Sequence, residues 1–398
     1  MDVEGSRIMN PRFFSACFSA YSCLLLCLAS SPLSRAELLH PGIAHSQERL
    51  DFVRTQISKQ ESPLQSAWIE LENSNYSSLD WKAEPRPHIE RGPYNNPNIG
   101  SSEFTNDGRA AYTHALHWNL SGEEERAKIA ADILDAWSAT LETVSNHDAR
   151  LLVGMSGFPY IVAAELLTHT WDGWPQKNQD RFKKMLREIW YPIIKDFYPT
   201  ANGNWDASMM QTIIAMGVYL DDKQMFDRVV HYTLEGEGNG AIDNYFIESG
   251  QCQESGRDQA HTQMGLEFLV NTCETTWIQG VDLYGAHNNR LLKGFEYTAK
   301  YNLGNKVPYQ PYKSFQGRYY YTELSDNARG RLRPMYEKAF NHYHNRKGLA
   351  APYSKEAIVK RKADALKRKN NSKRRRRKTE RVSSLPWSAL MYSGSSES

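Results

Sequence analysis

Apolar side chains recur at three- and four-residue spacing along most of this chain of 398 residues. That spacing places them on one face of an α-helix, whereas the strict alternation typical of a half-buried strand is scarce. The pattern predicts helices at residues 107–119, 123–143, 158–169, 178–197, 206–221, 223–234, 258–278, 283–302 and 329–345.

Turn-forming residues separate these segments, as at Asp172-Gly173-Trp174-Pro175 and Asn202-Gly203. Helices that arrive as hairpins favour a solenoid in which each pair buries its apolar face against the next. We therefore predict an all-α fold, an (α/α) toroid or incomplete α/α barrel around a central cleft, although periodicity does not establish ring closure. Residues 303–328 are aromatic-rich and lack a helical pattern, which at this length predicts a functional or a disordered loop. Its tyrosines favour the functional interpretation.

The N-terminus has the features of an export signal. Arg7 and Arg12 precede an apolar stretch over residues 16–29, and Ser34-Arg35-Ala36 offers small residues around a cleavable bond. We expect cleavage near Glu37 and a secreted protein, extracellular or periplasmic. An uncleaved membrane anchor is the alternative.

The chain then divides into three expected parts: a signal peptide over 1–36, a toroid over 37–354 and a C-terminal segment over 355–398. A hydrophobic content of 40%, with 12% aromatic residues, excludes a disordered chain. No stretch after the signal approaches the roughly 18 apolar residues of a membrane span. We expect no membrane partner after cleavage, and a monomer.

Only two of the five cysteines, Cys252 and Cys273, lie outside the signal. This leaves no disulfide framework and no zinc-binding spacing. The two cysteines either pair in an oxidising compartment or are small buried residues.

Charge is unevenly distributed. Residues 355–382 carry a net charge of +11 within a total of +2, so the rest of the chain carries about −9. The basic run over 373–378 has the composition of a nucleic-acid patch, but an export signal argues against a nucleic-acid partner. A solvated insertion and a polyanion-binding arm both remain possible.

The densest polar segment is residues 248–261, with the sequence Glu-Ser-Gly-Gln-Cys-Gln-Glu-Ser-Gly-Arg-Asp-Gln-Ala-His. If a helix begins near Gly256, Arg257 and His261 share one face. The alternatives are a surface ion pair of Arg257 with Glu254 or Asp258, and a core histidine at position 261.

Two further clusters contain residues that could bind a substrate or take part in catalysis. Asn202-Gly203-Asn204-Trp205-Asp206 precedes a helix, and capping accounts for one asparagine but not both. Trp205 could serve as a platform for a sugar ring. The loop holds a third cluster, formed by Tyr309, Tyr312, Arg318, Tyr319, Tyr320 and Tyr321.

These motifs, together with Asn-Asn-Arg-Leu-Leu-x-Gly-Phe-Glu-Tyr at 288–297 and Asn-His-Tyr at 341–343, resemble the alginate lyase superfamily. The most similar branch contains the mannuronate and glucuronate lyases of polysaccharide lyase family thirty-eight. The resemblance runs from about Gly92 to Tyr353. It implies an α/α toroid, an acidic polysaccharide as the partner, and β-elimination without a metal or other cofactor. The basic run at 360–378 departs from the family pattern.

The reaction explains the residue types. Elimination removes the proton beside a uronate carboxylate, so that carboxylate must be neutralised and the developing enolate stabilised. We expect Asn204, Arg257 and His261 to act there. The resemblance implies a tyrosine that transfers protons, for which we favour Tyr319; Tyr312, or His261 as base, are the alternatives. The expected substrate-binding residues are Trp205, Gln253, Glu254, Tyr312 and Arg318.

The predicted function is a lyase on mannuronan, glucuronan or a similar polyuronate. One alternative is a glycoside hydrolase, for which Asp206, Glu248 and Glu254 offer carboxylates. The other is a non-catalytic protein that binds polyanions through the basic run.

Overall fold

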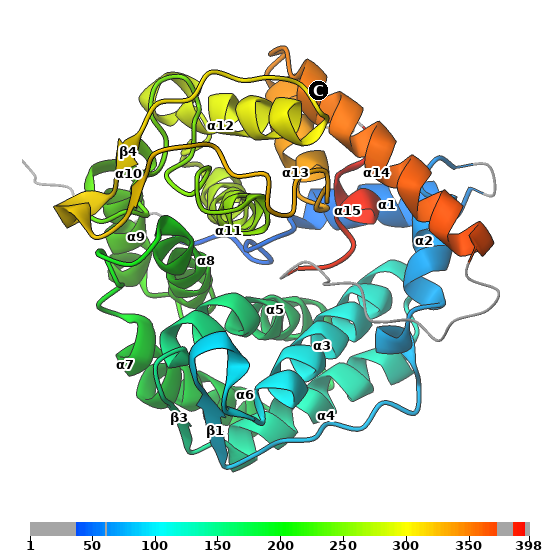
Figure 1. Ribbon diagram of the computed structural model, residues 1–398. Coiled ribbons are helices and arrows are strands. Elements are labelled where there is room, and N and C mark those ends of the chain that lie inside the picture. Colours follow the sequence, from blue (N-terminus) through cyan, green and yellow to red (C-terminus); the bar gives the residue numbers. More distant parts are fainter. Residues whose placement is uncertain (1–36, 60–61, 372–384, 395–398) are drawn as a thin grey trace, which may run out of the picture. The chain divides into compact units, whose positions relative to one another are not determined.

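The computed structural model describes residues 37–59, 62–371 and 385–394, and the side chains up to 367 within the middle range. The expected signal peptide and the basic run over 373–378 lie outside the described residues. Leu38–Ser398 forms one compact unit. In Figure 1 its helices surround a central region, as predicted for an all-α toroid.

Helices make up most of the unit. The first half contains α1 (Gln47–Ile57), α2 (Gln65–Glu72), α3 (Ser101–Ser121), α4 (Glu124–Thr140), α5 (Ala149–Thr170), α6 (Gln176–Met185), the π-helical turn η3 (Leu186–Trp190) and α7 (Tyr191–Ile194). The second half contains α8 (Gly203–Tyr219), α9 (Lys223–Glu235), α10 (Ile242–Tyr245), α11 (Gln259–Ile278), α12 (Ala286–Asn302), α13 (Tyr336–Phe340), the π-helical turn η5 (Asn341–Arg346), α14 (Pro352–Asn371) and α15 (Ser388–Tyr392).

Four helices form a continuous inner layer. α3 packs against α5, α5 against α8, and α8 against α11. The backbones of α5 and α8 approach closely at Gly154, where an added Cβ would lie 2.8 Å from the Ser208 carbonyl carbon and 2.9 Å from the Met209 nitrogen. A side chain there would push the two helices apart, so glycine permits this packing.

α5 corrects one expectation. It has the length and composition of a membrane span, although no such stretch was expected after the signal. However, 89% of its most apolar window is buried inside the protein. The helix is apolar because neighbouring helices surround it.

Strands are few and short among the described residues. β1 (His88–Arg91) pairs in parallel with β3 (Thr143–Ser145) and antiparallel with β2 (Asn98–Ile99). β4 (Tyr312–Lys313) and β5 (Tyr320–Tyr321) form a hairpin in the tyrosine-rich loop. The short 3₁₀ segments are η1 (Asn75–Ser77), η2 (Pro93–Asn95) and η4 (Phe315–Gly317).

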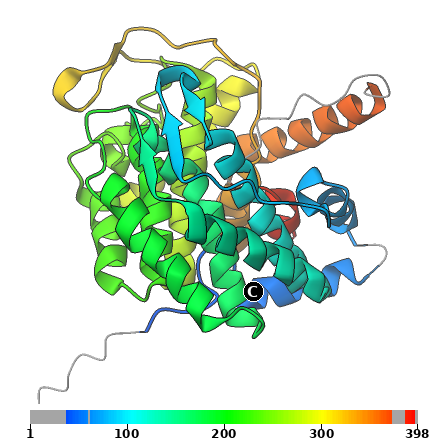
Figure 2. The same cartoon turned by 90° about the horizontal axis from the view of Figure 1, so that it is seen from below.

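The C-terminal helices belong to the same unit. α14 packs against α12 and α13, and α15 contacts α1 and α13. Figure 2 shows the far end of α14 leading away from the other helices. The boundary expected between 354 and 355 falls inside α14. Cys252 and Cys273 are both buried and free, which confirms the interpretation as small core residues.

Candidate active site

The turn into α8 brings polar groups to the start of an inner helix. Gly203 is the first residue of α8, and an added Cβ there would lie 2.4 Å from the Asn239 carbonyl oxygen. Asn202 occupies the N-cap position but makes no capping bond. Its Oδ1 accepts instead from Gln253 Nε2 at 3.0 Å and from the Tyr321 hydroxyl at 3.2 Å. The turn is thus tied to the 248–261 segment and to the loop.

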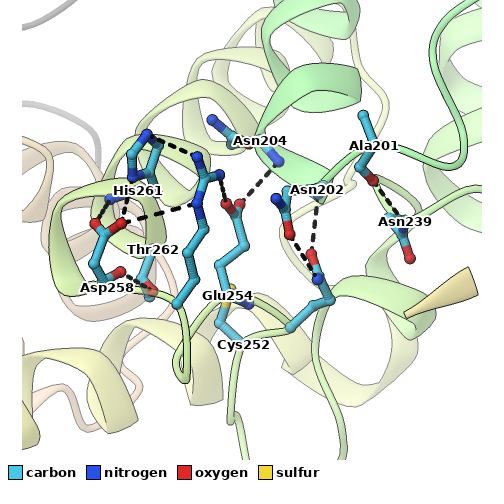
Figure 3. A network of polar contacts seen from close by, with 12 residues as sticks. Ala201, Asn202, Asn204, Asn239, Cys252, Glu254, Asp258, His261 and Thr262 are labelled. Carbon is cyan, nitrogen blue, oxygen red and sulfur yellow. Dashed lines mark hydrogen bonds and ion pairs between the residues drawn. The ribbon is translucent and has the colours of Figure 1, made fainter. Parts of the chain in front are cut away.

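A buried carboxylate links the two predicted motifs. Glu254 is fully buried, and its Oε2 accepts from the Asn204 backbone nitrogen at 3.0 Å and the Tyr245 hydroxyl at 2.6 Å. Its Oε1 accepts from Arg257 Nη1 at 2.7 Å (Figure 3). Charge-assisted bonds of this kind hold both the turn and the guanidinium in fixed positions.

Arg257 and His261 meet, although not within one helix. α11 begins at Gln259, after the N-cap Asp258, rather than near Gly256. Arg257 Nη2 nevertheless lies 3.2 Å from His261 Nε2. Burial opposes the charge of Arg257, but the Glu254 carboxylate outweighs it and raises the pKa of the guanidinium. The site therefore keeps a permanent cation.

Asp258 orients the histidine. Its Oδ1 accepts from the His261 backbone nitrogen at 2.8 Å, and its Oδ2 lies 2.6 Å from His261 Nδ1. Burial raises the pKa of Asp258, but the bonds from His261 outweigh burial and leave that pKa below its usual value. The Asp258 carboxylate can only accept a hydrogen bond, so the proton of a neutral His261 ring lies on Nδ1 and the lone pair lies on Nε2.

Asn204 holds an amide that is free of protein partners. The residue is fully buried, and neither Oδ1 nor Nδ2 has a hydrogen-bond partner in the described part of the chain. Leaving such a group unpaired costs about 1–3 kcal/mol. A substrate oxygen or a bound water that reached this amide would remove the cost.

The 303–328 loop is fastened across the 248–261 segment. The Gln251 side chain bonds both the nitrogen and the carbonyl oxygen of Gln310, at 3.0 and 2.8 Å. Gln259 donates two further bonds to the loop: its backbone nitrogen donates to the Asn327 carbonyl at 2.9 Å, and its Nε2 donates to the Ser325 carbonyl at 3.1 Å. The loop is therefore ordered, and functional placement of its tyrosines is favoured over disorder.

The tyrosines of the loop differ in surroundings. Tyr312 donates its hydroxyl to the Asn244 carbonyl, which occupies it. Tyr319 lies under the Arg318 guanidinium and stacks parallel to Tyr321, with ring centroids 6.3 Å apart. Burial, followed by the charge of Glu254, raises the pKa of Tyr321 to about 12. Tyr321 is a protonated phenol at neutral pH.

Arg318 and Trp205 lie beside this group. Arg318 is exposed, and its Nη1 donates to the Tyr198 hydroxyl at 3.2 Å. Trp205 packs edge-on against Tyr198 at 5.5 Å and His147 at 5.4 Å. That these two residues contact the substrate stays a prediction.

Several predicted roles change with burial. Gln253 and Glu254 are buried and bonded to protein groups, so we interpret them as positioning residues rather than substrate contacts. Tyr312 is likewise occupied by Asn244. Asp206 accepts from the Tyr198 nitrogen and the Tyr232 hydroxyl, and burial raises its pKa to about 6. It supports the turn rather than facing a substrate.

Sequence reasoning did not select Asp258 or Tyr321 for the site. Asp258 carries a recognisable signal, since an aspartate three residues before His261 fits a helix N-cap. Tyr321 carries none, because Tyr319, Tyr320 and Tyr321 look alike in sequence and only the hairpin decides which hydroxyl points to Asn202.

Comparison with known proteins shows which solved structures share this fold. An alginate lyase from Bacteroides ovatus superposes with a TM-score of 0.59 at 12% identity, over 89% of this chain and 100% of that one. Alginate lyase A1-III from Sphingomonas species A1 gives 0.57 at 14% identity, over 78% and 91%. A histidine variant of A1-III, complexed with a tetrasaccharide, gives 0.54 at 15% identity, over 77% and 89%.

At these identities the solved structures establish the toroidal fold alone. A search of curated proteins gives no match. The family model described as alginate lyase, however, matches residues 53–308, which is more than half of the chain. The protein therefore belongs to the alginate lyase family and is a polysaccharide lyase.

Proposed function

We propose that this protein is secreted and cleaves mannuronan or glucuronan, like the lyases of family thirty-eight, by β-elimination that needs no catalytic metal. The observation that carries the proposal is the Asp258–His261–Arg257 chain beside the unpartnered amide of Asn204. It combines a cation, a neutral amide and an oriented imidazole, which are the groups that elimination next to a carboxylate requires.

Arg257 and Asn204 stabilise the negative charge. The substrate carboxylate forms an ion pair with the Arg257 guanidinium. The Asn204 amide donates a hydrogen bond to the enolate that develops when the neighbouring proton leaves. Glu254 keeps both groups in place, because its carboxylate bonds the Asn204 backbone and Arg257. Positioning of this kind lowers the barrier without any movement of the donors during reaction.

His261 is the base in this scheme. Asp258 holds its Nδ1–H, so the Nε2 lone pair is available once the substrate carboxylate draws Arg257 Nη2 away. The proton on the carbon beside the carboxylate moves to Nε2, its electron pair forms the carbon–carbon double bond, and the bond to the glycosidic oxygen breaks. A tyrosine hydroxyl of the loop protonates that oxygen, and we assign this role to Tyr321, with Tyr319 as the alternative.

Consecutive tyrosines allow a matched test of the acid. Tyr321→Phe should lower kcat by about 100-fold or more while substrate affinity stays within about tenfold, because only a proton donor is lost. Tyr320→Phe, at a residue 53% exposed, should be near normal. Calorimetry and steady-state rates measure both. An inactive Tyr319→Phe with an active Tyr321→Phe would keep the loop but move the acid to Tyr319.

The product decides between the function classes. Incubation with polymannuronate and polyglucuronate should yield unsaturated uronate ends that absorb in the ultraviolet, since elimination creates a conjugated double bond. Fragments made in isotopically labelled water should carry no new oxygen at the cleaved linkage. New reducing ends with labelled oxygen and no ultraviolet signal would contradict elimination and favour a hydrolase.

A hydrolase has little structural support. Asp206 and Glu254 are buried and bonded within the protein, and Glu248 is exposed. Acid–base hydrolysis requires two carboxyl groups that face the substrate, and the bonds of Asp206 and Glu254 to protein groups leave them unsuited to that role. Salt-sensitive binding of both polymers without any chain shortening would instead favour the polyanion-binding alternative.

A further inference from the structure

A second polar cluster lies at the other end of the inner helices. Glu165 and His169 are one turn apart near the end of α5, and Asp221 follows α8. The turn at Asn202 in the candidate active site precedes α8, whose 17 residues span roughly 25 Å at 1.5 Å per residue. His40, from the start of the described chain, joins the cluster. The cluster is therefore separate from the candidate active site.

The distances within the cluster are short. His40 Nδ1 lies 2.8 Å from Glu165 Oε1, and His169 Nε2 lies 3.6 Å from Glu165 Oε2. One ligand atom from each of the three residues lies within 4.8 Å of the others. Ligands of a tetrahedral Zn²⁺ with bonds of about 2.0–2.1 Å are separated by roughly 3.3 Å, which is close to the separations found here.

Glu165 supplies the independent observation. The residue is 1% exposed, and its Oε2 has no hydrogen-bond partner in the described part of the chain. A buried carboxylate oxygen without a hydrogen bond is costly, and an ion-binding site is one explanation for it. This oxygen faces His169, on the side where the third ligand is needed.

Asp221 completes the arrangement. Its Oδ1 lies 3.0 Å from His40 Nε2, the ring nitrogen that does not face Glu165. Metal-binding histidines commonly donate their second ring N–H to a carboxylate, which fixes the tautomer and the ring orientation. With Asp221 on Nε2, the lone pair of a neutral His40 is directed from Nδ1 toward Glu165.

We propose that His40, Glu165 and His169 bind a divalent transition metal ion, with Zn²⁺ as the preferred ion, and that Asp221 supports His40 from outside the coordination shell. Two imidazoles and a carboxylate are a common ligand set for Zn²⁺. The rings of His40 and His169 now stack with centroids 4.2 Å apart and planes 10° apart. One ring must turn so that both lone pairs meet at the ion.

The ion would fasten the N-terminal segment to the inner helices. Gly42 already donates its backbone nitrogen to Glu165 Oε1 at 3.0 Å, and the Gln279 side chain bonds Leu39 and Gly42. A metal bond between His40 and α5 adds a stronger link at the same place. The expected role is structural, since the cluster lies far from Arg257 and His261.

A protonated His40 bridging Glu165 and Asp221 is the competing explanation. That arrangement satisfies both ring nitrogens of His40. It leaves Glu165 Oε2 without a hydrogen bond, with only the 3.6 Å contact to His169 Nε2. Direct binding measurements separate the two explanations.

The test uses the untagged chain after treatment with a chelator, titrated with Zn²⁺ in a calorimeter. We expect one Zn²⁺ per chain, a higher melting temperature with Zn²⁺, and unchanged initial rates of polyuronate cleavage. His169→Ala should weaken binding at least about 100-fold, and Asp221→Asn by about 10- to 100-fold. The matched control is His231→Ala, since His231 and Glu235 form a similar one-turn pair on α9 that is 70% exposed and lacks a third ligand.

Binding of Co²⁺ provides a spectroscopic check, because nitrogen ligands in a tetrahedral site give strong visible absorption that the His169→Ala chain should lose. No stoichiometric Zn²⁺, or equal affinity of His169→Ala and the unaltered chain, would overturn the proposal and leave the protonated bridge. Asp221 is 69% exposed, so its variant tests the site even if His169→Ala fails to fold.

Discussion

Arg257→Ala and His261→Ala are each expected to lower kcat for polyuronate cleavage by at least about 100-fold, while the helical content stays unchanged. Loss of one preorganised donor costs on the order of 3 kcal/mol in the transition state, which corresponds to a factor of about 100 or more. In the proposed mechanism, Arg257 is the cation that faces the substrate carboxylate, and His261 carries the lone pair that takes the proton. The two effects should not add in a double variant, because the residues act together.

Arg181→Ala is a suitable control for Arg257. Arg181 also pairs with a carboxylate, Asp135, and its side chain is 36% exposed compared with 28% for Arg257. Circular dichroism and steady-state rates on all variants measure the effect. Unfolding of Arg257→Ala would assign its ion pair with Glu254 a structural role, and near-normal rates would remove both residues from the mechanism.

Mild acid should destabilise the folded protein. Burial lowers the pKa of His45 and His114 to about 3, and that of His117 and His342 to about 4, from the ordinary 6.5. Below pH 6.5 these histidines therefore bind protons in the unfolded chain but not in the folded chain. Stability from these groups is present above pH 6.5 and is lost as the pH falls toward 4.

Other groups, among them Asp206 and His40, oppose this trend. Burial raises the pKa of Asp206 to about 6, so the folded chain takes up one proton that the unfolded chain does not bind until near 3.8. With four histidines against Asp206 and His40, whose pKa the bond to Glu165 raises to about 9, linkage gives a loss of about 3 kcal/mol between pH 7.5 and 5.5. That is a substantial part of the 5–15 kcal/mol typical of folded proteins.

Urea unfolding at half-unit pH intervals measures the loss, and its slope gives the number of protons taken up on unfolding. His231→Gln provides the control, because that histidine is 70% exposed and should leave the slope unchanged. A free energy of unfolding that stays constant from pH 7.5 to 5.5 would show that the buried histidines are protonated in the folded chain.

The sequence pattern predicted the inner helices well because they carry long apolar faces. α3, α5, α8 and α11 all appeared as periodic segments, although α3 begins six residues and α5 nine residues before the predicted start. The pattern missed α1, α2 and α14 and the short helices α10 and α15. α1 buries only Arg49, Leu50 and Val53, and α14 is dominated by charged residues, so neither has a clear apolar stripe. Their positions depend on tertiary contacts that periodicity does not report.

The candidate site was predicted in part. Arg257 and His261 meet as expected, but Asp258 at the helix start brings them together rather than a shared helix face. The supporting role of Glu254 could not be predicted, because its partners Asn204 and Tyr245 come from two other segments. The His40 cluster was not predicted for a similar reason, since 125 residues separate His40 from Glu165 in the sequence.

The fastening of the tyrosine-rich loop has a consequence for turnover. The side chains of Gln251 and Gln259 hold the loop at Gln310 and Ser325, on either side of its hairpin. At about 1 kcal/mol for each net hydrogen bond, swinging the loop aside would cost several kcal/mol. Gating by such a motion would make release slow and strongly dependent on temperature, and we expect neither. The cleaved polymer is therefore expected to leave along the loop while the loop stays in place. Solvent viscosity and polymer length, rather than loop motion, should then govern the rate of product release.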